Sequence, residues 1–363
     1  MSGQETKQAV LSGDANRAPE RSADRSSRLA RSALFCAGFL ALLVIPFIAS
    51  SYFLAIAISI FIAVIGSVGT NLILGVAGQA SIGTAALMAI GAFATAQTAV
   101  YYHWPFLAAV LAGGVASAVV GVLIAIPAMR VRGLYLIIAT LALFYVATFL
   151  LTRYQAAKVG DTGFLLPQLT FGNLNPLVSW YYIIGAIAVV VVLVMGNLLR
   201  TRFGRAWSAM ARDEVTTAVI GVRVRAEKIR VFAVSSFLIG IAGGLYGYYT
   251  GDVTIGVFTL DLAISYIAMC VIGGLGSVAG SVLGAVFVIG LPYLVTQLTD
   301  QLPATQAAFM SNHVFDLEVV VYGIAIVGFL VWERRGLAHL LSRAFSIAWS
   351  RLSGRRGTEA SSE

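Results

Sequence analysis

Residues 71–83 read NLILGVAGQASIG, a stretch in which glycines and polar side chains interrupt an otherwise apolar run. A small-residue helical pattern, residues 84–94 (TAALMAIGAFA), follows directly. A second interruption, residues 272–280 (IGGLGSVAG), precedes a similar pattern at residues 281–290 (SVLGAVFVIG). Broken apolar segments at corresponding places in two halves of a chain are typical of a transport site. They predict two glycine-broken helix pairs that form a pseudo-repeat.

Small residues also let neighbouring membrane helices pack closely, so packing explains the glycines alone at least as well. The polar side chains of the first interruption favour a path for solute. Asn71, Gln79 and Ser81 lie beside non-helical backbone, which is tolerated at membrane depth only where it is buried or faces a cavity. We take these three residues as candidates for the translocation path, together with Gly273 and Gly274 of the second interruption.

Only 11% of the 363 residues are charged and 59% are hydrophobic, whereas about 25% of an ordinary soluble domain is charged. Residues 32–129 contain no Asp, Glu, Lys or Arg, which leaves room for about four helices of about 20 residues each. Further uncharged windows cover residues 133–152, 162–199, 231–251 and 262–299, and a short apolar segment surrounds 317–332. We expect an all-α integral membrane protein with about ten hydrophobic segments, or nine if one does not cross.

The basic residues cluster between the apolar runs, which indicates membrane topology rather than binding to nucleic acid. If the N-terminus is cytoplasmic and every segment crosses, 22 of the 24 Lys and Arg residues fall inside, and only Arg153 and Lys158 fall outside. The positive-inside rule therefore predicts cytoplasmic N- and C-termini. We expect residues 1–31 to be a disordered cytoplasmic tail, 32–334 a transmembrane domain and 335–363 a basic cytoplasmic tail.

The longest cytoplasmic loop, residues 200–230, has the pattern of one amphipathic helix. Apolar residues recur in it every three or four positions, which predicts a helix over residues 205–220 that Gly221 stops. Its apolar face could dock on another protein, lie in the lipid headgroup layer or pack on the protein's own base, and the pattern does not separate these. The apolar stripe includes Trp207 and Met210, and the charged face includes Arg205, Arg212, Asp213 and Glu214.

The sequence contains no energy source of its own. The hydrophobic segments carry no charged residue in their interiors, whereas proton- or sodium-coupled carriers usually place ionisable groups there. None of the three lysines follows a glycine, so the G-K-[ST] core of a nucleotide-binding P-loop is absent from the sequence. The histidines and the two cysteines lack the spacing of metal ligands or of a disulfide framework. We expect no catalytic group, metal or cofactor in this chain.

Several motifs together resemble one known family. Residues 71–86 resemble the signature of the branched-chain amino acid ABC permeases (LivM/LivH type), and residues 132–142 (RGLYLIIATLA) resemble a motif of the LivM side. Residues 204–232, from Gly-Arg-Ala through Gly221 and Lys228, resemble the family's cytoplasmic loop, and residues 271–277 (VIGGLGS) its late membrane motif. The matches occur in the right order over most of the chain, which is more specific than any single glycine motif.

The resemblance implies a transmembrane permease subunit of an ATP-driven importer for branched-chain or other small amino acids, in a bacterial inner membrane. It implies ABC ATPase subunits that use the ATP, a second permease subunit in a heterodimer, and an extracytoplasmic substrate-binding protein. Through the second motif it adds Tyr135 and Thr140 to the path candidates. It also favours docking on the ATPase as the role of the helix over residues 205–220.

Two other functions fit the same residues. A related permease for urea or short amides would need the same partners and differ only in its solute. A passive channel for small neutral solutes would likewise need no charge inside the membrane. An importer subunit would copurify with an ATPase and a binding protein, whereas a channel would not.

Overall fold

The computed structural model of the protein describes residues 50–128, 134–167 and 175–300, together with Pro46 and the short pieces 323–324, 327–328 and 336–338. The predicted tail 1–31, the first hydrophobic segment and most of the predicted tail 335–363 lie outside the described residues. Residues 1–54 and 55–363 form two compact units. In the first unit, the Phe53 N–H donates to Ser50 Oγ (3.4 Å) at the start of helix α3. The features described below belong to the second unit.

Helices dominate the described residues because all backbone N–H and C=O groups of a membrane segment must be paired within the protein. Six helices there are long and apolar enough to cross a membrane. They are α3 (Ser51–Asn71), α4 (Thr84–Tyr101), α5 (Phe106–Ala128), α6 (Leu134–Lys158), α7 (Pro176–Leu198) and α10 (Val224–Thr250). Two further apolar helices are α11 (Leu260–Gly273) and α12 (Val278–Asp300). The predicted all-α membrane class is confirmed, whereas the ten segments and the pseudo-repeat stay predictions.

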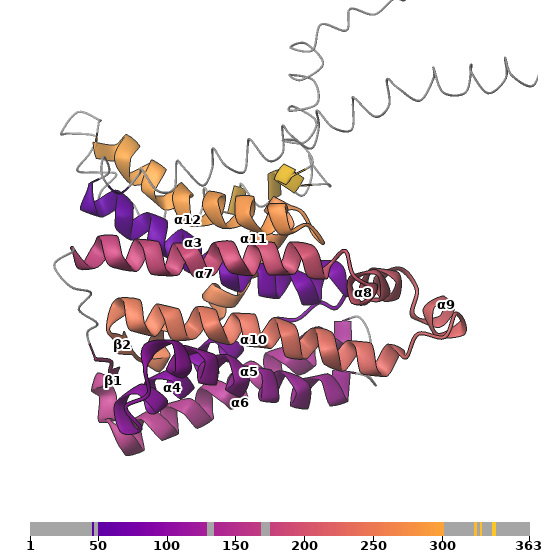
Figure 1. The fold of residues 1–363 in the computed structure, drawn as a ribbon, viewed down its shortest axis with the longest axis horizontal. Coiled ribbons are helices and arrows are strands. Elements are labelled where there is room, and N and C mark those ends of the chain that lie inside the picture. The colour runs from indigo at the N-terminus through magenta and orange to yellow at the C-terminus, as the bar shows by residue number, and fades with distance from the viewer. Residues whose placement is uncertain are drawn as a thin grey trace, which may run out of the picture. The chain divides into compact units, whose positions relative to one another are not determined.

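Helix α10 packs along both α5 and α4, and α4 packs against α5 (Figure 1). Glycines allow the close approach: a Cβ atom added to Gly91 of α4 would stand 2.4 Å from Cα of Gly240 in α10. The Ser235 hydroxyl of α10 donates to the carbonyl oxygen of Gly69 in α3 (2.6 Å). Small residues and hydroxyl groups thus join the helices, as is common in membranes.

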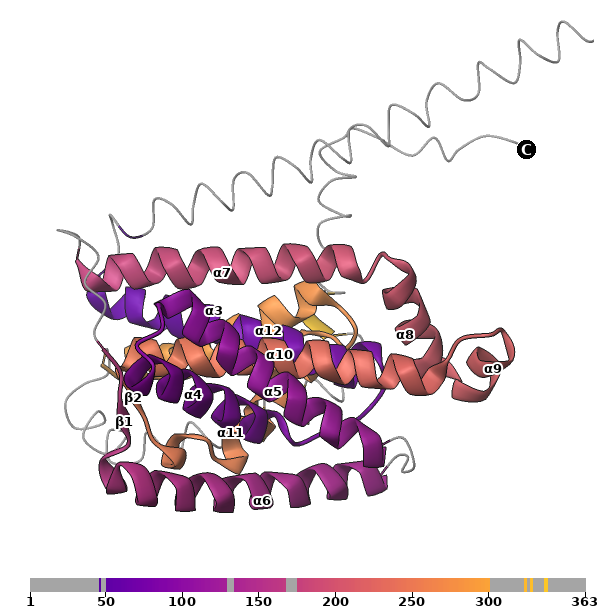
Figure 2. The same cartoon turned by 60° about the horizontal axis from the view of Figure 1, so that its bottom comes forward.

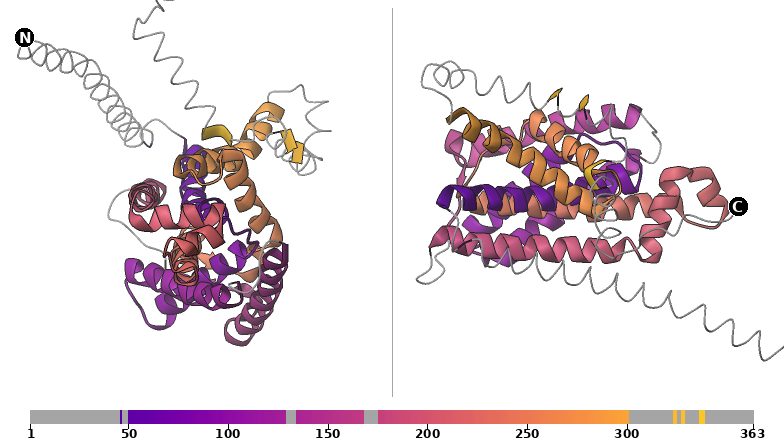
Figure 3. Two further views of the ribbon diagram at one scale, coloured as in Figure 1. Left: turned by 90° about the vertical axis from the view of Figure 1, so that its right-hand side faces the viewer. Right: turned by 90° about the horizontal axis from the view of Figure 1, so that it is seen from above.

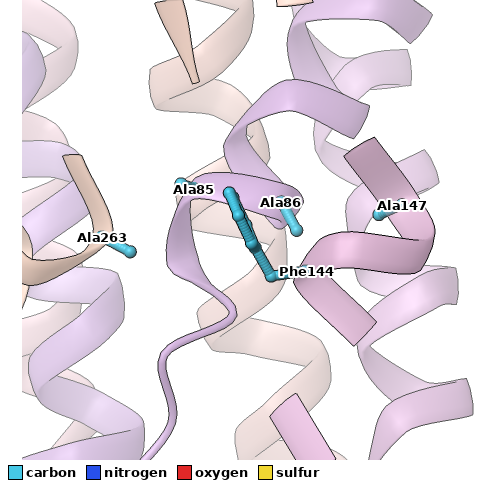
Figure 4. Packing of buried hydrophobic residues seen from close by; sticks show 5 residues of the cluster. All are labelled: Ala85, Ala86, Phe144, Ala147 and Ala263. Atoms are coloured by element: carbon cyan, nitrogen blue, oxygen red, sulfur yellow. The ribbon is translucent and has the colours of Figure 1, made fainter. Parts of the chain in front are cut away.

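The first turn of α4 is fixed by a buried apolar cluster. Ala85 and Ala86 of α4 pack there with Phe144 and Ala147 of α6 and with Ala263 of α11 (Figure 4). Because α4 begins directly after the first glycine-rich stretch, the cluster holds one end of that stretch in place.

Short elements lie at the two ends of the long helices. Strands β1 (Phe164–Leu165) and β2 (Asp252–Val253) pair antiparallel, with Phe164 opposite Val253, and the 3-10 helices η2 (Gly160–Thr162) and η3 (Ile255–Val257) flank them. Helices α8 (Arg202–Arg212) and α9 (Glu214–Val219) lie at the opposite end (Figures 2 and 3). The strand pair and the α8–α9 pair are therefore candidates for opposite sides of the membrane.

Candidate functional site

Both glycine-rich stretches interrupt helices. The chain leaves α3 through the π-helix η1 (Leu72–Val76) and is non-helical over residues 77–83, which we call the first break. Between α11 and α12 it is non-helical over residues 274–277, the second break. Short π-helical turns inside longer helices are frequent at functional sites.

The side-chain amide of Asn71 ties the second break to the end of α3, where the first break begins. Its Nδ2 donates to the carbonyl oxygen of Ser277 (3.0 Å) and to Ser281 Oγ (2.7 Å), and its Oδ1 accepts from the Gly276 N–H (2.8 Å). An amide side chain has two N–H donors and one carbonyl acceptor, and all are engaged here. The buried amide of Asn71 thus holds together two segments that are about 200 residues apart, and its place in the path stays a prediction.

The two breaks also touch through backbone. A Cβ atom at Gly75 would stand 2.1 Å from the Gly276 nitrogen, so only glycine permits this approach. Gly276 itself has a φ of +77°, a left-handed conformation that favours glycine. The predicted path residues Gly273 and Gly274 belong to the same close packing: a Cβ at Gly273 would lie 1.9 Å from the carbonyl oxygen of Gly280. Both glycines therefore make close backbone contacts, and their part in the path stays a prediction.

Two predicted path residues complete the backbone hydrogen bonding of the first break. Thr140 Oγ1 of α6 accepts from the Ile82 N–H (3.1 Å) and donates to the carbonyl oxygen of Ile137 (3.0 Å). Ser81 Oγ accepts from the Gly83 N–H (3.2 Å). Both hydroxyl groups are buried and position the loop. The remaining candidate on α6, Tyr135, is 73% exposed on that helix and makes no part of this arrangement.

Gln79 differs from these residues. It is only 5% exposed, and neither Oε1 nor Nε2 has a hydrogen-bond partner among the described residues. A buried amide without partners costs about 1–3 kcal/mol for each unpaired group, which is unusual in a folded protein. Gln79 also lines a cavity of about 340 Å³ between the first break and α8, which we call the α8 cavity. Gln79 is thus a path candidate whose polar atoms are unpaired and which lines a cavity.

The predicted single helix over residues 205–220 is two helices. Asp213 separates α8 from α9, with φ and ψ of −156° and 115°, and its Oδ1 accepts from the Val215 N–H (2.9 Å). The prediction was wrong because an Asp side chain that caps a new helix competes with continuation of the old one. Gly221 stops α9 as predicted, with a φ of +89°.

Trp207 and Met210 were predicted on a docking face, but each is only 2% exposed and packs within this chain. Trp207 Nε1 donates to Glu227 Oε2 of α10 (2.9 Å). Since a docking surface must be accessible, these two side chains anchor α8 rather than contact a partner.

Two charged residues near the start of α10 hold both short helices. Glu227 binds Trp207 of α8 and forms an ion pair with Arg230, and Lys228 Nζ lies 2.6 Å from Glu214 Oε1 of α9. Glu227 and Lys228 are 7% and 3% exposed. Removing one partner of a buried ion pair costs about 3–5 kcal/mol. No role was predicted for either residue, although adjacent opposite charges at the start of an apolar segment are a usable signal.

Helix α8 lies directly on the first break. A Cβ atom at Gly78, whose φ is +66°, would stand 3.1 Å from Cα of Ala211. Arg205 and Arg212 are exposed on the same helix. Helix α9 exposes an apolar surface of its own, the α9 patch, which consists of Val215 (63% exposed), Val219 (81%) and Ile220 (69%). No group of three or more His, Cys, Asp or Glu side chains suited to a metal ion occurs in the described part of the chain.

Residues 52–330 match the model of a protein family described as branched-chain amino acid transport system / permease component. The chain belongs to this family. Since the matched range contains both breaks, α8, α9 and the first turn of α10, the arrangement described above lies within the family's permease region. Family membership therefore classes the chain with membrane permease components.

Individual relatives agree with this family. The chain is 30% identical over 224 residues to the high-affinity branched-chain amino acid transport system permease protein LivM of Escherichia coli (strain K12), covering 54% of this chain and 53% of that protein. It is 26% identical over 236 residues to the probable branched-chain amino acid transport permease protein LivM of Methanocaldococcus jannaschii. The match covers 63% of this chain and 67% of that protein.

A third relative is the autoinducer 2 import system permease protein LsrC of Escherichia coli O9:H4 (strain HS), 29% identical over 154 residues that cover 40% of this chain and 44% of that protein. The matched part spans about half the length of the LivM protein of Escherichia coli. No solved structure matches the chain.

Replacing Asn71 by Ala should destabilise the protein, because the Gly276 N–H and the acceptors on Ser277 and Ser281 lose the buried amide that pairs with them. We expect a loss of about 1–3 kcal/mol or more, measured as a lower midpoint of thermal aggregation in detergent. The matched control is Asn197→Ala, which changes an exposed residue near the end of α7. Equal midpoints for the two variants would contradict the role assigned to the Asn71 amide.

Proposed function

We propose that the protein is a transmembrane permease subunit of an ATP-driven importer. It contributes to the translocation path for branched-chain or other small amino acids and couples that path to a separate ATPase. Membership of the permease family supports the proposal, and one structural observation carries it: α8 lies on the first break, where a Cβ at Gly78 would meet Ala211 at 3.1 Å. A partner that moves α8 and α9 therefore acts directly on the non-helical backbone that carries Gln79.

The coupling works through rigid contacts. The α9 patch receives the ATPase, since it is apolar and exposed beside the charged residues Asp213 and Glu214. Glu227 and Lys228 transfer the movement of α8 and α9 to α10 through their bonds to Trp207 and Glu214. Because α10 packs along α4 and α5, the movement reaches the helix that follows the first break.

Membership of the permease family supports the proposed partners. The ATPase subunits bind the ATP, because the sequence has no P-loop. A second permease subunit completes the path as a heterodimer, and an extracytoplasmic binding protein delivers the solute. The exposed apolar stripe along α5 faces lipid or the second subunit; it contains Leu107, Leu111, Val115 and Val119.

In the orientation that we propose, α8 and α9 lie in the cytoplasm and the strand pair lies outside. The membrane is a bacterial inner membrane. Eight Lys and Arg residues lie between positions 200 and 230, which contain α8 and α9, whereas only Arg153 and Lys158 lie near the strand end.

Changing Val215, Val219 and Ile220 together to Ser should remove the ATPase from the purified assembly. Each buried aliphatic side chain contributes about 1.5–3 kcal/mol to an interface, so we expect binding to weaken about a hundredfold or more. ATP-driven uptake should fall because less ATPase is bound. Because the three side chains are exposed in this chain, its own stability should remain normal.

The matched control changes Leu165 and Val257 to Ser, which removes exposed apolar side chains at the opposite end of the helices. It should retain the ATPase. If the α9 variant retains the ATPase and transports normally, α9 is not the coupling element. If the unmodified protein transports solute without any ATPase, it is a passive channel.

Single cysteines test the orientation on intact cells. Ser208 on α8 and Asp161 near β1 are both exposed. With an impermeant thiol reagent, Asp161→Cys should be labelled on intact cells and Ser208→Cys only after permeabilisation. Cys270 is fully buried and Cys36 is replaced by Ser in both variants. Labelling at position 208 on intact cells would reverse the orientation.

A further inference from the structure

The α8 cavity has the size and the lining of a small-molecule site. Its volume of about 340 Å³ lies at the lower end of the range for ligand pockets, about 300–1,000 Å³. It is bounded by the first break and by the ends of α6, α8 and α10. Its polar lining consists of Gln79, Arg212, Asp213, Glu214 and Lys228.

Among the residues that the structure describes, the charges that line this cavity balance. Arg212 and Lys228 supply two positive charges, and Asp213 and Glu214 supply two negative charges. Lys228 is already paired with Glu214 (Nζ–Oε1 2.6 Å). Within the described part of the chain, the Arg212 guanidinium makes no ion pair. A cavity with both signs of charge and no net charge favours a dipolar solute over a simple ion, because an anion alone would also meet the two carboxylates.

Two polar groups in the cavity lining have no hydrogen-bond or ion-pair partner among the described residues. The Gln79 amide is buried with both of its polar atoms unpaired, and the Arg212 guanidinium is unpaired as described above. A carboxylate suits this pair, since guanidinium binds carboxylate through two parallel N–H···O bonds and an amide N–H adds a third donor. Urea or a short amide would satisfy Gln79 but would leave the arginine without an anion.

We propose that the α8 cavity binds the zwitterionic head group of a small amino acid from the cytoplasmic side. Arg212 and Gln79 hold the carboxylate, and Asp213 and Glu214 balance the ammonium group. The inference rests on the proposed function for the solute class and for the side of the membrane. Because α8 and the first break both line the cavity, the bound solute contacts the coupling helix and the path at once.

The test is a ligand-detected NMR titration of the purified permease–ATPase assembly, without nucleotide and without the binding protein. The probe is L-leucine, and the competitors are leucinamide, which lacks the carboxylate, and 4-methylpentanoate, which lacks the ammonium group. We expect leucine to bind. Each analogue should have a dissociation constant at least about tenfold higher, because it lacks one of the two charged groups that make charge-assisted contacts.

Variants locate the site. Arg212→Gln and Gln79→Leu should each weaken leucine binding by about tenfold or more. The matched control is Arg205→Gln, which changes another exposed arginine of α8 that does not line the cavity, and it should bind as the unmodified assembly does.

Absence of leucine binding overturns the inference, and so does binding that neither Arg212→Gln nor Gln79→Leu changes. Equal binding of leucine and 4-methylpentanoate would make it an anion site and contradict the zwitterion assignment. Uptake into proteoliposomes is measured in parallel. If the unmodified assembly shows normal ATP-driven uptake, the proposed function stands whatever the binding titrations give. If its uptake does not depend on ATP, the proposed function itself is overturned.

Discussion

The amide of Asn71 is the interaction on which the arrangement of both breaks depends. It donates to Ser277 and Ser281 and accepts from Gly276, so one side chain satisfies polar groups of a loop that has no regular hydrogen bonding of its own. Gly75 permits this contact because a Cβ there would stand 2.1 Å from the Gly276 nitrogen, and Gly276 adopts a left-handed φ of +77° that favours glycine. Non-helical backbone inside a membrane protein is tolerated only when such partners exist.

The contacts of Asn71 and Gly75 with the second break, which we call the junction, explain why the first break can carry an unsatisfied polar side chain. The loop is fixed at one end by Asn71 and at the other by the apolar cluster around the first turn of α4, and Thr140 pairs with its backbone between them. Held in this way, the loop keeps Gln79 buried without partners. The buried charges of Glu227 and Lys228 then hold α8 and α9 to α10, so the proposed coupling helices and the first break share one support.

Sequence patterns predicted the local features and missed the long-range ones. Glycine spacing located both breaks, uncharged runs located the membrane helices, and Gly221 located the end of α9, because each depends on neighbours in the chain. The hydrogen bonds of Asn71 were not predicted because its partners are about 200 residues away in the chain. Periodicity placed Trp207 on an apolar face but could not show that α10 covers that face. The break at Asp213 was missed because a capping side chain competes with helix continuation at a single residue.

The most direct test of the junction uses the native Cys270 of α11. Ser67 of α3, one turn before Asn71, places its Oγ 3.9 Å from Cys270 Sγ. The variant chain carries Ser67→Cys, Cys36→Ser and a protease site inserted beside Asp161. A membrane-permeant oxidant should form a disulfide between positions 67 and 270, so that the two fragments stay joined after the protease cuts the chain. The rate of this cross-link is compared with Asn71 present and with Asn71→Ala. A fast reaction that slows markedly in the Asn71→Ala chain is the predicted result, and equal rates, or no cross-link in either chain, would contradict it.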